Sequence, residues 1–192
     1  MAWIDLLMSW WPSSMGGIYI RRFAWKFRFA GCGRKVNFGE RLTILGFSSI
    51  RVGQGCSFMS GSYLYSHVGG RLTIGANCSF NHNVMLAASG GEISIGDDVL
   101  MGPNTVLRAA DHEFADPAKP IRLQGHRRGR IEIGDNVWLA ANVVVTSNVR
   151  IGDGVVVGAG SVVTHDLPPM TVCAGVPARP IRSRMESVSA IQ

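Results

Sequence analysis

The chain has 192 residues, of which 46% are hydrophobic and 17% are charged, and its formal net charge is +6. This length fits one domain of about 100–200 residues with a substantial core. The composition is too apolar for a disordered chain, and the 24 glycines show no collagen-like spacing. Because the usual glycine share is about 7%, so many glycines predict a fold with many tight turns.

The excess positive charge lies in residues 1–35, where six basic side chains face a single acidic one, Asp5. Nucleic-acid binding would need a basic stripe on the folded body, so this charge predicts no nucleic-acid partner. The same segment is rich in aromatic residues, which are Trp3, Trp10, Trp11, Phe23, Trp25, Phe27 and Phe29.

We expect residues 1–35 to form a helical segment. Its apolar stretch precedes its positive charge, which is the reverse of a secretory signal. Asp5, Pro12 and Gly16-Gly17 interrupt the run of about 20 apolar residues that a membrane span needs. Two interpretations stay open: aromatic rings beside cations are typical of a helix at a membrane interface, and a solenoid end is typically covered by a cap.

The four cysteines form no Cys-x-x-Cys pair and no zinc-type spacing. We therefore expect no metal site, and reduced thiols in a cytosolic protein. Cys56 and Cys78 each precede a Ser-Phe pair at the same place in a repeat, which predicts that both are small buried hydrophobic residues. The other two are Cys32 and Cys173.

An aliphatic residue recurs at every sixth position in the C-terminal half of the chain. The series is Ile133, Leu139, Val145, Ile151, Val157 and Val163, and a smaller companion precedes each by two residues: Ile131, Val137, Val143, Val149, Val155 and Ser161. The same spacing occurs upstream in Ile74, Phe80 and Leu86 and in Ile95, Met101 and Leu107. A helix of 3.6 residues per turn cannot keep a six-residue period on one face.

Three such hexads predict one triangular coil of about 18 residues, with the apolar residues inside and hydrogen bonds between coils about 4.8 Å apart. This is a parallel β-helix. The general rule for parallel crossovers favours right-handed connections, and the residues alone do not predict the opposite hand.

The ordered combination of three segments resembles the hexapeptide-repeat acyltransferases, in the branch that transfers acetyl groups from acetyl-CoA to sugar hydroxyls. These segments are Ile133-Gly-Asp-Asn-Val-Trp-Leu139, Gly158-Ala-Gly-Ser-Val-Val-Thr164 and Ala174-Gly-Val-Pro-Ala-Arg-Pro-Ile-Arg182. The resemblance covers residues 50–183 and implies an all-β, left-handed parallel β-helix. We expect this domain at 36–183, with a loop insertion at 108–130 and a tail at 184–192.

The stretch from Met101 to His112 resembles the family segment that ends in the catalytic histidine, so the resemblance implies that His112 is the general base. Imidazole titrates near neutral pH and can move a proton between a hydroxyl and a leaving thiolate. The resemblance also implies that Asn81 binds the acceptor or orients the histidine. The open alternatives are a turn histidine beside Asp111 and an ordinary turn asparagine.

The resemblance implies a donor site for acetyl-CoA, with Ala141, Ala159 and Thr164 at the pantetheine and Trp138 beside the thioester. It places Arg179 and Arg182 at the nucleotide phosphates, which suit guanidinium donors. The alternative for these two arginines is a solvated basic tail. The remaining histidines, His67, His82, His126 and His165, are weaker candidates for any chemical role.

These expectations describe an acetyl-CoA-dependent sugar O-acetyltransferase of surface polysaccharide biosynthesis that needs no metal. The resemblance implies a homotrimer with active sites between subunits. We expect a cytoplasmic protein, with residues 1–30 as its contact to the inner face of the membrane if they do more than cap the solenoid. The alternatives are an antibiotic O-acetyltransferase, an amino-sugar N-acyltransferase and a non-catalytic scaffold.

Overall fold

The structure is a computed structural model that describes residues 3–67 and 69–185. Residues 186–192 of the predicted tail lie outside the described residues, as do the side chains of residues 3–6, which include Trp3 and Asp5. Among the described residues, no helix is long and apolar enough to cross a membrane.

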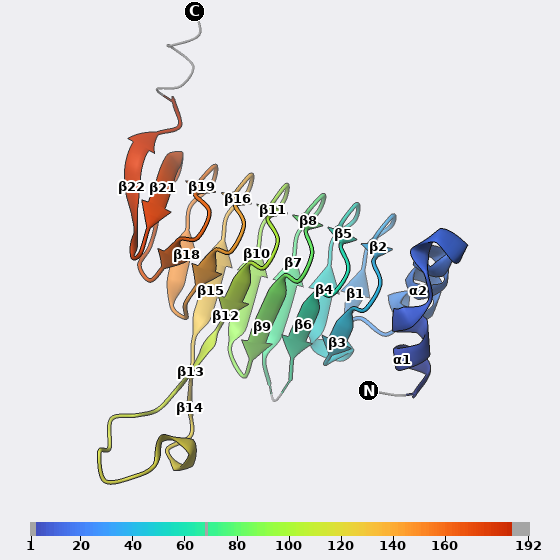
Figure 1. The fold of residues 1–192 in the computed structure, drawn as a ribbon, viewed down its shortest axis with the longest axis horizontal. Coiled ribbons are helices and arrows are strands. Elements are labelled where there is room, and N and C mark those ends of the chain that lie inside the picture. Colours follow the sequence, from blue (N-terminus) through green and yellow to red (C-terminus); the bar gives the residue numbers. More distant parts are fainter. Residues whose placement is uncertain (1–2, 68, 186–192) are drawn as a thin grey trace, which may run out of the picture.

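Most of the described chain coils into a prism with three sheets, which we name sheets A, B and C (Figure 1). Sheet A contains β1 (Gly31–Cys32), β4 (Ile50–Val52), β7 (Arg71–Ile74), β10 (Glu92–Ile95), β15 (Arg130–Ile133) and β18 (Val149–Ile151). Sheet B contains β2 (Asn37–Phe38), β5 (Ser57–Phe58), β8 (Ser79–Phe80), β11 (Leu100–Met101), β16 (Trp138–Leu139), β19 (Val156–Val157), β21 (Thr171–Gly175) and β22 (Ala178–Ser183). Sheet C contains β3 (Thr43–Leu45), β6 (Tyr63–Ser66), β9 (Met85–Ser89), β12 (Val106–Arg108), β17 (Val144–Val145) and β20 (Val162–Val163).

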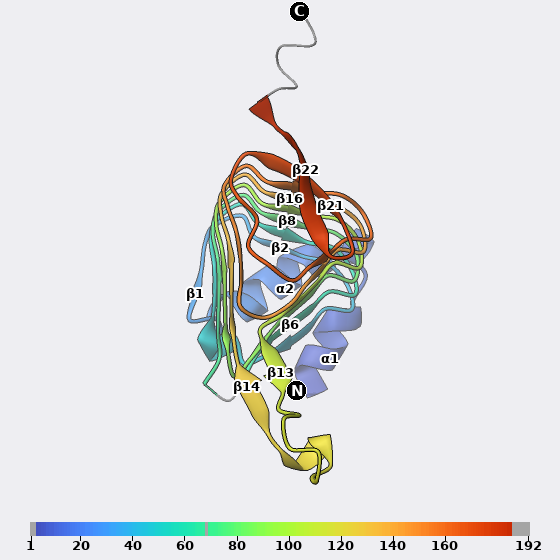
Figure 2. The ribbon, with the colours of Figure 1, turned by 90° about the vertical axis from the view of Figure 1, so that its left-hand side faces the viewer.

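The coil is left-handed. The chain passes through the sheets in the repeating order A, B, C. Seen from the C-terminal end, this path runs clockwise, from sheet A at the left over sheet B at the top to sheet C at the lower right, while the chain advances towards the viewer (Figure 2). The strands of successive coils pair in parallel, except β22, which pairs antiparallel with β21 at the C-terminal end. The expected left-handed parallel β-helix is confirmed.

The six-residue period arises because alternate residues of each short strand point into the prism. All the aliphatic residues of the predicted series lie in one continuous buried core, and so do their companions except Ser161, which is buried but polar. The period begins earlier than the sequence suggested, since Phe38, Ile44 and Val52 already lie in that core. Strands begin at Gly31, a few residues before the boundary predicted at residue 35.

The sequence Ile-Gly-Asp recurs from Ile95, Ile133 and Ile151, and its aspartate has a structural role at the corner between sheets A and B. The Asp97 carboxylate accepts a hydrogen bond from the Ala76 N–H at 2.6 Å, in the preceding coil. In the same way Asp135 accepts from the Asp97 N–H at 2.8 Å, and Asp153 accepts from the Asp135 N–H at 2.9 Å. Each aspartate thus binds the backbone of the coil before it and fixes the stacking of the turns.

The buried cysteines follow the prediction. Cys56 and Cys78 are buried in equivalent places, and their thiols lie 3.1 Å and 3.2 Å from the carbonyl oxygens of Gly75 and Gly96. The contact with Cys56, together with burial, raises the pKa of the Cys78 thiol. All four cysteines are free thiols.

The N-terminal end of the prism is covered by α1 (Trp3–Trp10), η1 (Ser13–Met15) and α2 (Gly17–Lys26) (Figure 1). Trp25 of α2 is buried and packs edge-on against Phe38 with ring centroids 5.5 Å apart. Phe29 stacks on the same ring at 5.5 Å. The buried side of these helices thus packs on the first coil of the prism.

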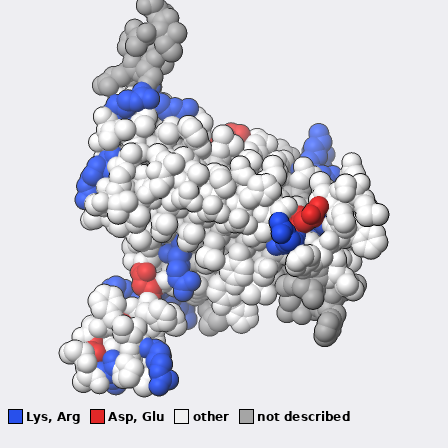
Figure 3. Space-filling model, in the orientation of Figure 1, with Lys and Arg blue, Asp and Glu red and all other residues white. Residues whose placement is uncertain are grey.

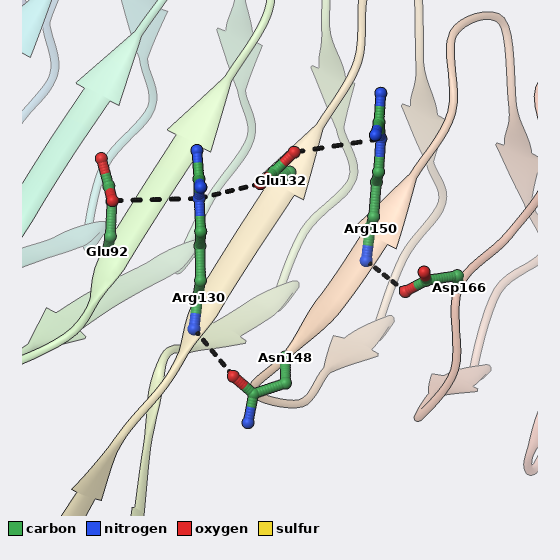
Figure 4. A network of polar contacts seen from close by, with 6 residues as sticks. All are labelled: Glu92, Arg130, Glu132, Asn148, Arg150 and Asp166. Atoms are coloured by element: carbon green, nitrogen blue, oxygen red, sulfur yellow. Dashed lines mark hydrogen bonds and ion pairs between the residues drawn. The ribbon is translucent and has the colours of Figure 1, made fainter.

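A ladder of charged side chains crosses the outer face of sheet A (Figure 4). Arg130 lies 2.8 Å from Glu132 and 3.8 Å from Glu92, and Arg150 lies 3.9 Å from Glu132. These pairs are exposed, and exposed ion pairs contribute about 0–1 kcal/mol each. The ladder therefore aligns neighbouring coils but contributes little to the free energy of unfolding.

The insertion leaves the prism at the corner between sheets C and A. It contains β13 (Ala110–His112), η3 (Ile121–Leu123) and β14 (His126–Arg128), and the two strands form an antiparallel hairpin. In Figures 1 and 2 this hairpin points away from the prism body. The chain then re-enters sheet A at β15, so the insertion does not interrupt the stack of coils.

Candidate active site

His112 ends the first strand of the inserted hairpin. In the hairpin it stands opposite His126, and Ala110 stands opposite Arg128. The rings of His112 and His126 are 4.2 Å apart between centroids. Because side chains alternate along a strand, these four residues share one face of the hairpin, and Asp111 and Arg127 share the other.

Asp111 anchors the hairpin and does not face the His112 ring. Its carboxylate accepts a hydrogen bond from the Ser147 hydroxyl, in the turn between β17 and β18. His112 itself lies in a strand and not in a turn. Its position therefore differs from that of a turn-capping histidine, and the hairpin holds its imidazole exposed at the edge of the prism.

The shared face of the hairpin borders a pocket of about 540 Å³ on the outer side of sheet C. Ala110, His126 and Arg128 line it from the hairpin. Three sheet C strands supply the rest of the wall, with Tyr63 and Tyr65 from β6, Met85 and Ala87 from β9, and Arg108 from β12. None of the lining residues is acidic. His112 is not part of this lining, but its ring lies 4.2 Å from the ring of His126, which is.

A second group of predicted residues lies at the corner between sheets B and C. Register pairs Met101 with Leu139 and Leu139 with Val157, so that the turns after these strands stack in successive coils. Ala141 and Ala159 are consequently neighbours, and the Ala141 carbonyl accepts the Gly160 N–H at 2.9 Å. Trp138 is half exposed on sheet B just before this turn.

Asn81 lies in the same column of turns, two coils before Ala141. Its backbone N–H donates to the Met101 carbonyl at 2.9 Å, and its side-chain oxygen accepts the His82 N–H at 2.7 Å. This is the contact of a turn asparagine, and it leaves the side chain exposed. The structure thus brings Asn81 and the residues Trp138, Ala141 and Ala159 onto one corner.

The structure does not bring Asn81 and His112 together within one copy of the chain. Asn81 precedes sheet C, His112 follows it, and the strand β9 between these two corners has five residues. At about 3.3 Å per residue, the strand alone separates the corners by roughly 15 Å. Figure 2 shows the hairpin leaving the far corner, at the bottom of the view.

The remaining predicted donor residues gather at the C-terminal end. The Thr164 hydroxyl lies 2.8 Å from Nδ1 of His165, and the same ring nitrogen lies 3.5 Å from the Arg179 guanidinium. Arg182 lies in the same strand as Arg179. Arg184 binds the solenoid itself, since its guanidinium donates to the Gly154 carbonyl at 3.0 Å. Lys and Arg side chains on the face in Figure 3 gather at the two ends of the prism and on the hairpin.

Sequence reasoning missed the pocket. The sequence makes His126 only a weak candidate for a chemical role, but its ring faces His112 across the hairpin. The sequence predicts no role for Tyr63, Tyr65, Arg108 and Arg128. The only sequence signal for them is the alternation within the hexads, which predicts the residues that point out of the prism. This alternation does not predict where the hairpin folds. No group of His, Cys, Asp and Glu among the described residues could hold a metal ion.

Residues 130–165 match the family model described as bacterial transferase hexapeptide (six repeats). Galactoside O-acetyltransferase from Escherichia coli K12 is 39% identical over 124 residues, which cover 62% of this chain and 57% of that enzyme. The chain thus spans little more than half the length of this curated relative, and similar shares hold for others.

Two solved structures resemble the whole coil. The hexapeptide-repeat-containing acetyltransferase VCA0836 of Vibrio cholerae, complexed with acetyl-CoA, is 30% identical, with a TM-score of 0.60 over 86% of this chain and 77% of that chain. AntD, an N-acyltransferase from Bacillus cereus in complex with dTDP and 3-hydroxybutyryl-CoA, is 23% identical, with a TM-score of 0.76 over 95% and 94%. The likeness to AntD concerns the fold alone. With the repeat, the coil and these matches in agreement, the chain belongs to the hexapeptide-repeat acetyltransferase family.

Proposed function

We propose that this protein is an acetyl-CoA-dependent O-acetyltransferase that acts on a sugar hydroxyl in surface polysaccharide assembly, with His112 as the general base. The observation that carries the proposal is the position of His112 on a hairpin anchored to a hexapeptide-repeat solenoid, with its ring 4.2 Å from that of His126, which lines a pocket. Family membership supports the reaction class, and the sugar O-acetyltransferase among its relatives supports the acceptor class.

In the proposed reaction the acceptor hydroxyl attacks the thioester carbonyl while His112 takes its proton. The tetrahedral intermediate then collapses, the carbon–sulfur bond breaks, and the imidazolium returns the proton to the departing thiolate of coenzyme A. Imidazole suits both transfers because it titrates near neutral pH. The transfer is direct, so no acyl group is held on the protein, and no step needs a metal.

The donor would lie along the column of turns at the corner between sheets B and C. Ala141 and Ala159 would offer backbone groups to the pantetheine amides, and Trp138 would form an apolar wall beside the thioester. Thr164 would add a contact, and Arg179 and Arg182 would bind the phosphates through forked guanidinium donors. Asn81, at the same corner, would bind the acceptor or orient the base.

A complete site would need two copies of the chain, since His112 and Asn81 lie at opposite edges of sheet C. A ring in which the hairpin corner of one copy meets the turn column of the next would join them. Closed rotational symmetry generates such heterologous contacts. We therefore infer a homotrimer, as the family resemblance implies, with each site shared between neighbours.

The test is thiol release from acetyl-CoA with a panel of neutral sugars, sugar nucleotides, amino sugars and antibiotics. We expect release that depends on a sugar hydroxyl acceptor, and a fall of about 10²- to 10⁴-fold in His112→Ala, the range for loss of a general base. Coenzyme A binding by calorimetry should persist in the variant. No release with any acceptor, together with no coenzyme A binding, would favour the scaffold. The best acceptor decides between O- and N-acyl transfer.

We also infer that the cap docks on the cytoplasmic face of a membrane. The side of α1, η1 and α2 that faces away from the prism carries exposed apolar side chains, and the exposed fraction reaches 77% for both Phe23 and Phe27. We name it the aromatic face, and it comprises Leu7, Trp10, Trp11, Met15, Tyr19, Phe23 and Phe27. Arg22 and Lys26 lie beside its rings, within 5.9 Å of Tyr19 and 5.7 Å of Phe27. Such a combination suits anionic lipid headgroups, and four free cysteines suit a reducing compartment.

Vesicle flotation tests this contact. We expect the protein to float with vesicles that contain phosphatidylglycerol, and a smaller fraction to float at high salt. The double variant Phe23→Glu with Phe27→Glu should not float. Leu123→Glu, an equally apolar exposed site on the distant insertion, is the matched control and should still float. Equal flotation of the double variant would contradict the lipid contact.

A further inference from the structure

The pocket beside His112 is shaped by the residues that face outward from three successive coils. In one row across sheet C, Tyr65, Ala87 and Arg108 lie side by side. Because Ala87 is small, it leaves a hollow between the larger side chains of Tyr65 and Arg108. Ser89 and Gly90 extend this hollow towards the hairpin.

One wall of the pocket is a short series of aromatic rings. Tyr63 and Tyr65 are 6.0 Å apart between ring centroids, and the His67 ring, outside the lining, stacks on Tyr65 at 6.3 Å with an interplanar angle of 7°. Flat apolar surfaces of this kind pack against the carbon face of a ring-shaped ligand, while polar groups at the edge fix its orientation.

The opposite wall is cationic. Arg108 comes from sheet C and Arg128 from the hairpin, so two separate elements direct a guanidinium group to the same hollow. Among the described residues, no ion pair joins either arginine to an acid, whereas the neighbouring Arg127 lies 4.0 Å from Glu113 on the other face of the hairpin. The pocket therefore carries positive charge that its own lining does not neutralise.

We propose that this pocket binds the acceptor and selects a sugar that bears an anionic group. The sugar ring would lie against Tyr63 and Tyr65, and Arg108 and Arg128 would hold its carboxylate or phosphate through paired N–H donors. One hydroxyl would then face His112, beside His126. This inference rests on the proposed acetyl transfer and adds the charge of the acceptor to it.

The test compares three acceptors built on the glucose ring: neutral methyl glucoside, glucuronic acid with a carboxylate in place of the C6 hydroxymethyl group, and glucose 1-phosphate, which keeps the C6 hydroxyl and bears a phosphate at C1. With acetyl-CoA as donor, we expect kcat/KM to be at least 10-fold higher for one or both anionic sugars than for methyl glucoside. A preference for glucuronic acid assigns the carboxylate, and a preference for glucose 1-phosphate assigns the phosphate. Equal or higher kcat/KM for methyl glucoside would overturn the proposal while leaving acetyl transfer intact.

Variants locate the selectivity. Arg108→Gln and Arg128→Gln should each lower kcat/KM for the preferred anionic acceptor by about 10- to 100-fold, the range for loss of a charge-assisted hydrogen bond, with little change for methyl glucoside. Arg108→Lys should retain part of the preference, because it keeps the charge without the fork. Arg127→Gln, on the opposite face of the same hairpin, is the matched control and should behave like the native protein.

Oligomeric state and donor binding complete the test. Each variant should keep its mass in solution and its affinity for coenzyme A. Dissociation of the assembly in Arg108→Gln and Arg128→Gln would overturn the proposal, because it would assign this face to a subunit interface. If the native protein releases no thiol with any sugar and binds no coenzyme A, the proposed function itself has failed and not only the acceptor assignment.

Discussion

His112 owes its position to contacts outside its own strand. The face of the hairpin that bears His112 also carries His126, with 4.2 Å between the ring centroids. The opposite face is tied to the prism through Asp111, which accepts the hydrogen bond from Ser147. A hairpin that projects from a rigid coil needs such a tie, since small displacements of a catalytic group are costly. Ser147 is therefore a positioning residue for the proposed base.

Ser147→Ala removes the donor of this tie and leaves His112 in place. We expect kcat to fall by about 10- to 100-fold, the effect of a small misplacement of a catalytic group, while KM for acetyl-CoA and the melting temperature stay near native values. Steady-state kinetics with thermal unfolding measure both. The control is Ser57→Ala, whose hydroxyl donates to that of Ser79 at 3.3 Å, away from the site. Native kcat in Ser147→Ala would show that the tie does not position the base.

At the scale of elements, the first coils of the prism are held by a stack of phenylalanine rings. Phe38, Phe58 and Phe80 are nearly parallel, with centroids 5.6 Å and 4.7 Å apart. Phe58 lies in the middle and is buried. It stacks on rings in the coil before and in the coil after. The stack thus connects the core next to the cap with the coil that carries Asn81.

Phe58→Ala should lower the free energy of unfolding by about 3–5 kcal/mol, because it leaves a cavity between two rings. Phe58→Leu should cost less, since it keeps most of the volume. Met59→Ala, at the next and partly exposed position, should change stability by no more than about 0.5 kcal/mol. Urea denaturation gives all three values. Equal stability of Phe58→Ala and Met59→Ala would contradict the importance of the stack.

The cap is attached by one buried cation. Arg21 has no exposed surface. Its guanidinium group donates to carbonyl oxygens of the helical cap and of the first coil of the prism. The bonds are 2.8 Å to Phe38, 2.5 Å to Trp11 and 3.2 Å to Met8. Burial lowers the pKa of Arg21, and the nearby charge of Glu40 acts in the opposite direction.

Arg21→Met keeps the apolar stem and removes every donor, so it leaves buried carbonyl groups unpaired. We expect a loss of about 2–4 kcal/mol in the free energy of unfolding, or an earlier transition of the cap in which Trp25 becomes exposed. Tryptophan fluorescence during urea denaturation detects either result. Arg51→Met, at an exposed position on sheet A, serves as the control. A native transition in Arg21→Met would contradict this view of the cap.

The sequence predicted the coil and its strands better than it predicted which residues the fold brings together. The six-residue period is a local property of the chain, because each hexad places its own aliphatic residue inward, and it therefore predicted the coil. Where Arg128 or His126 comes to lie depends on a hairpin whose strands are separated by a long loop. Tyr63 and Arg108 are far apart in the sequence and meet only through the stacking of coils. The pocket therefore cannot be predicted from the sequence alone, because the fold brings its lining residues together.

At the scale of the whole molecule, the stack of coils separates the two halves of the proposed site. The hairpin corner carries His112, and the column of turns across sheet C carries Asn81, Ala141 and Ala159. A single copy therefore presents one half on each of two corners. Assembly through these corners would complete the site, and the rigid prism would fix the distance between one site and the next.

The most direct test of this account mixes two inactive variants, His112→Ala and Asn81→Ala, in one assembly. If the site is shared, a subunit that keeps His112 can meet a neighbour that keeps Asn81, and random mixing of equal amounts should restore about a quarter of native acetyl transfer. Each variant alone should show only residual thiol release. A co-expressed mixture that is no more active than the variants alone would contradict the shared site.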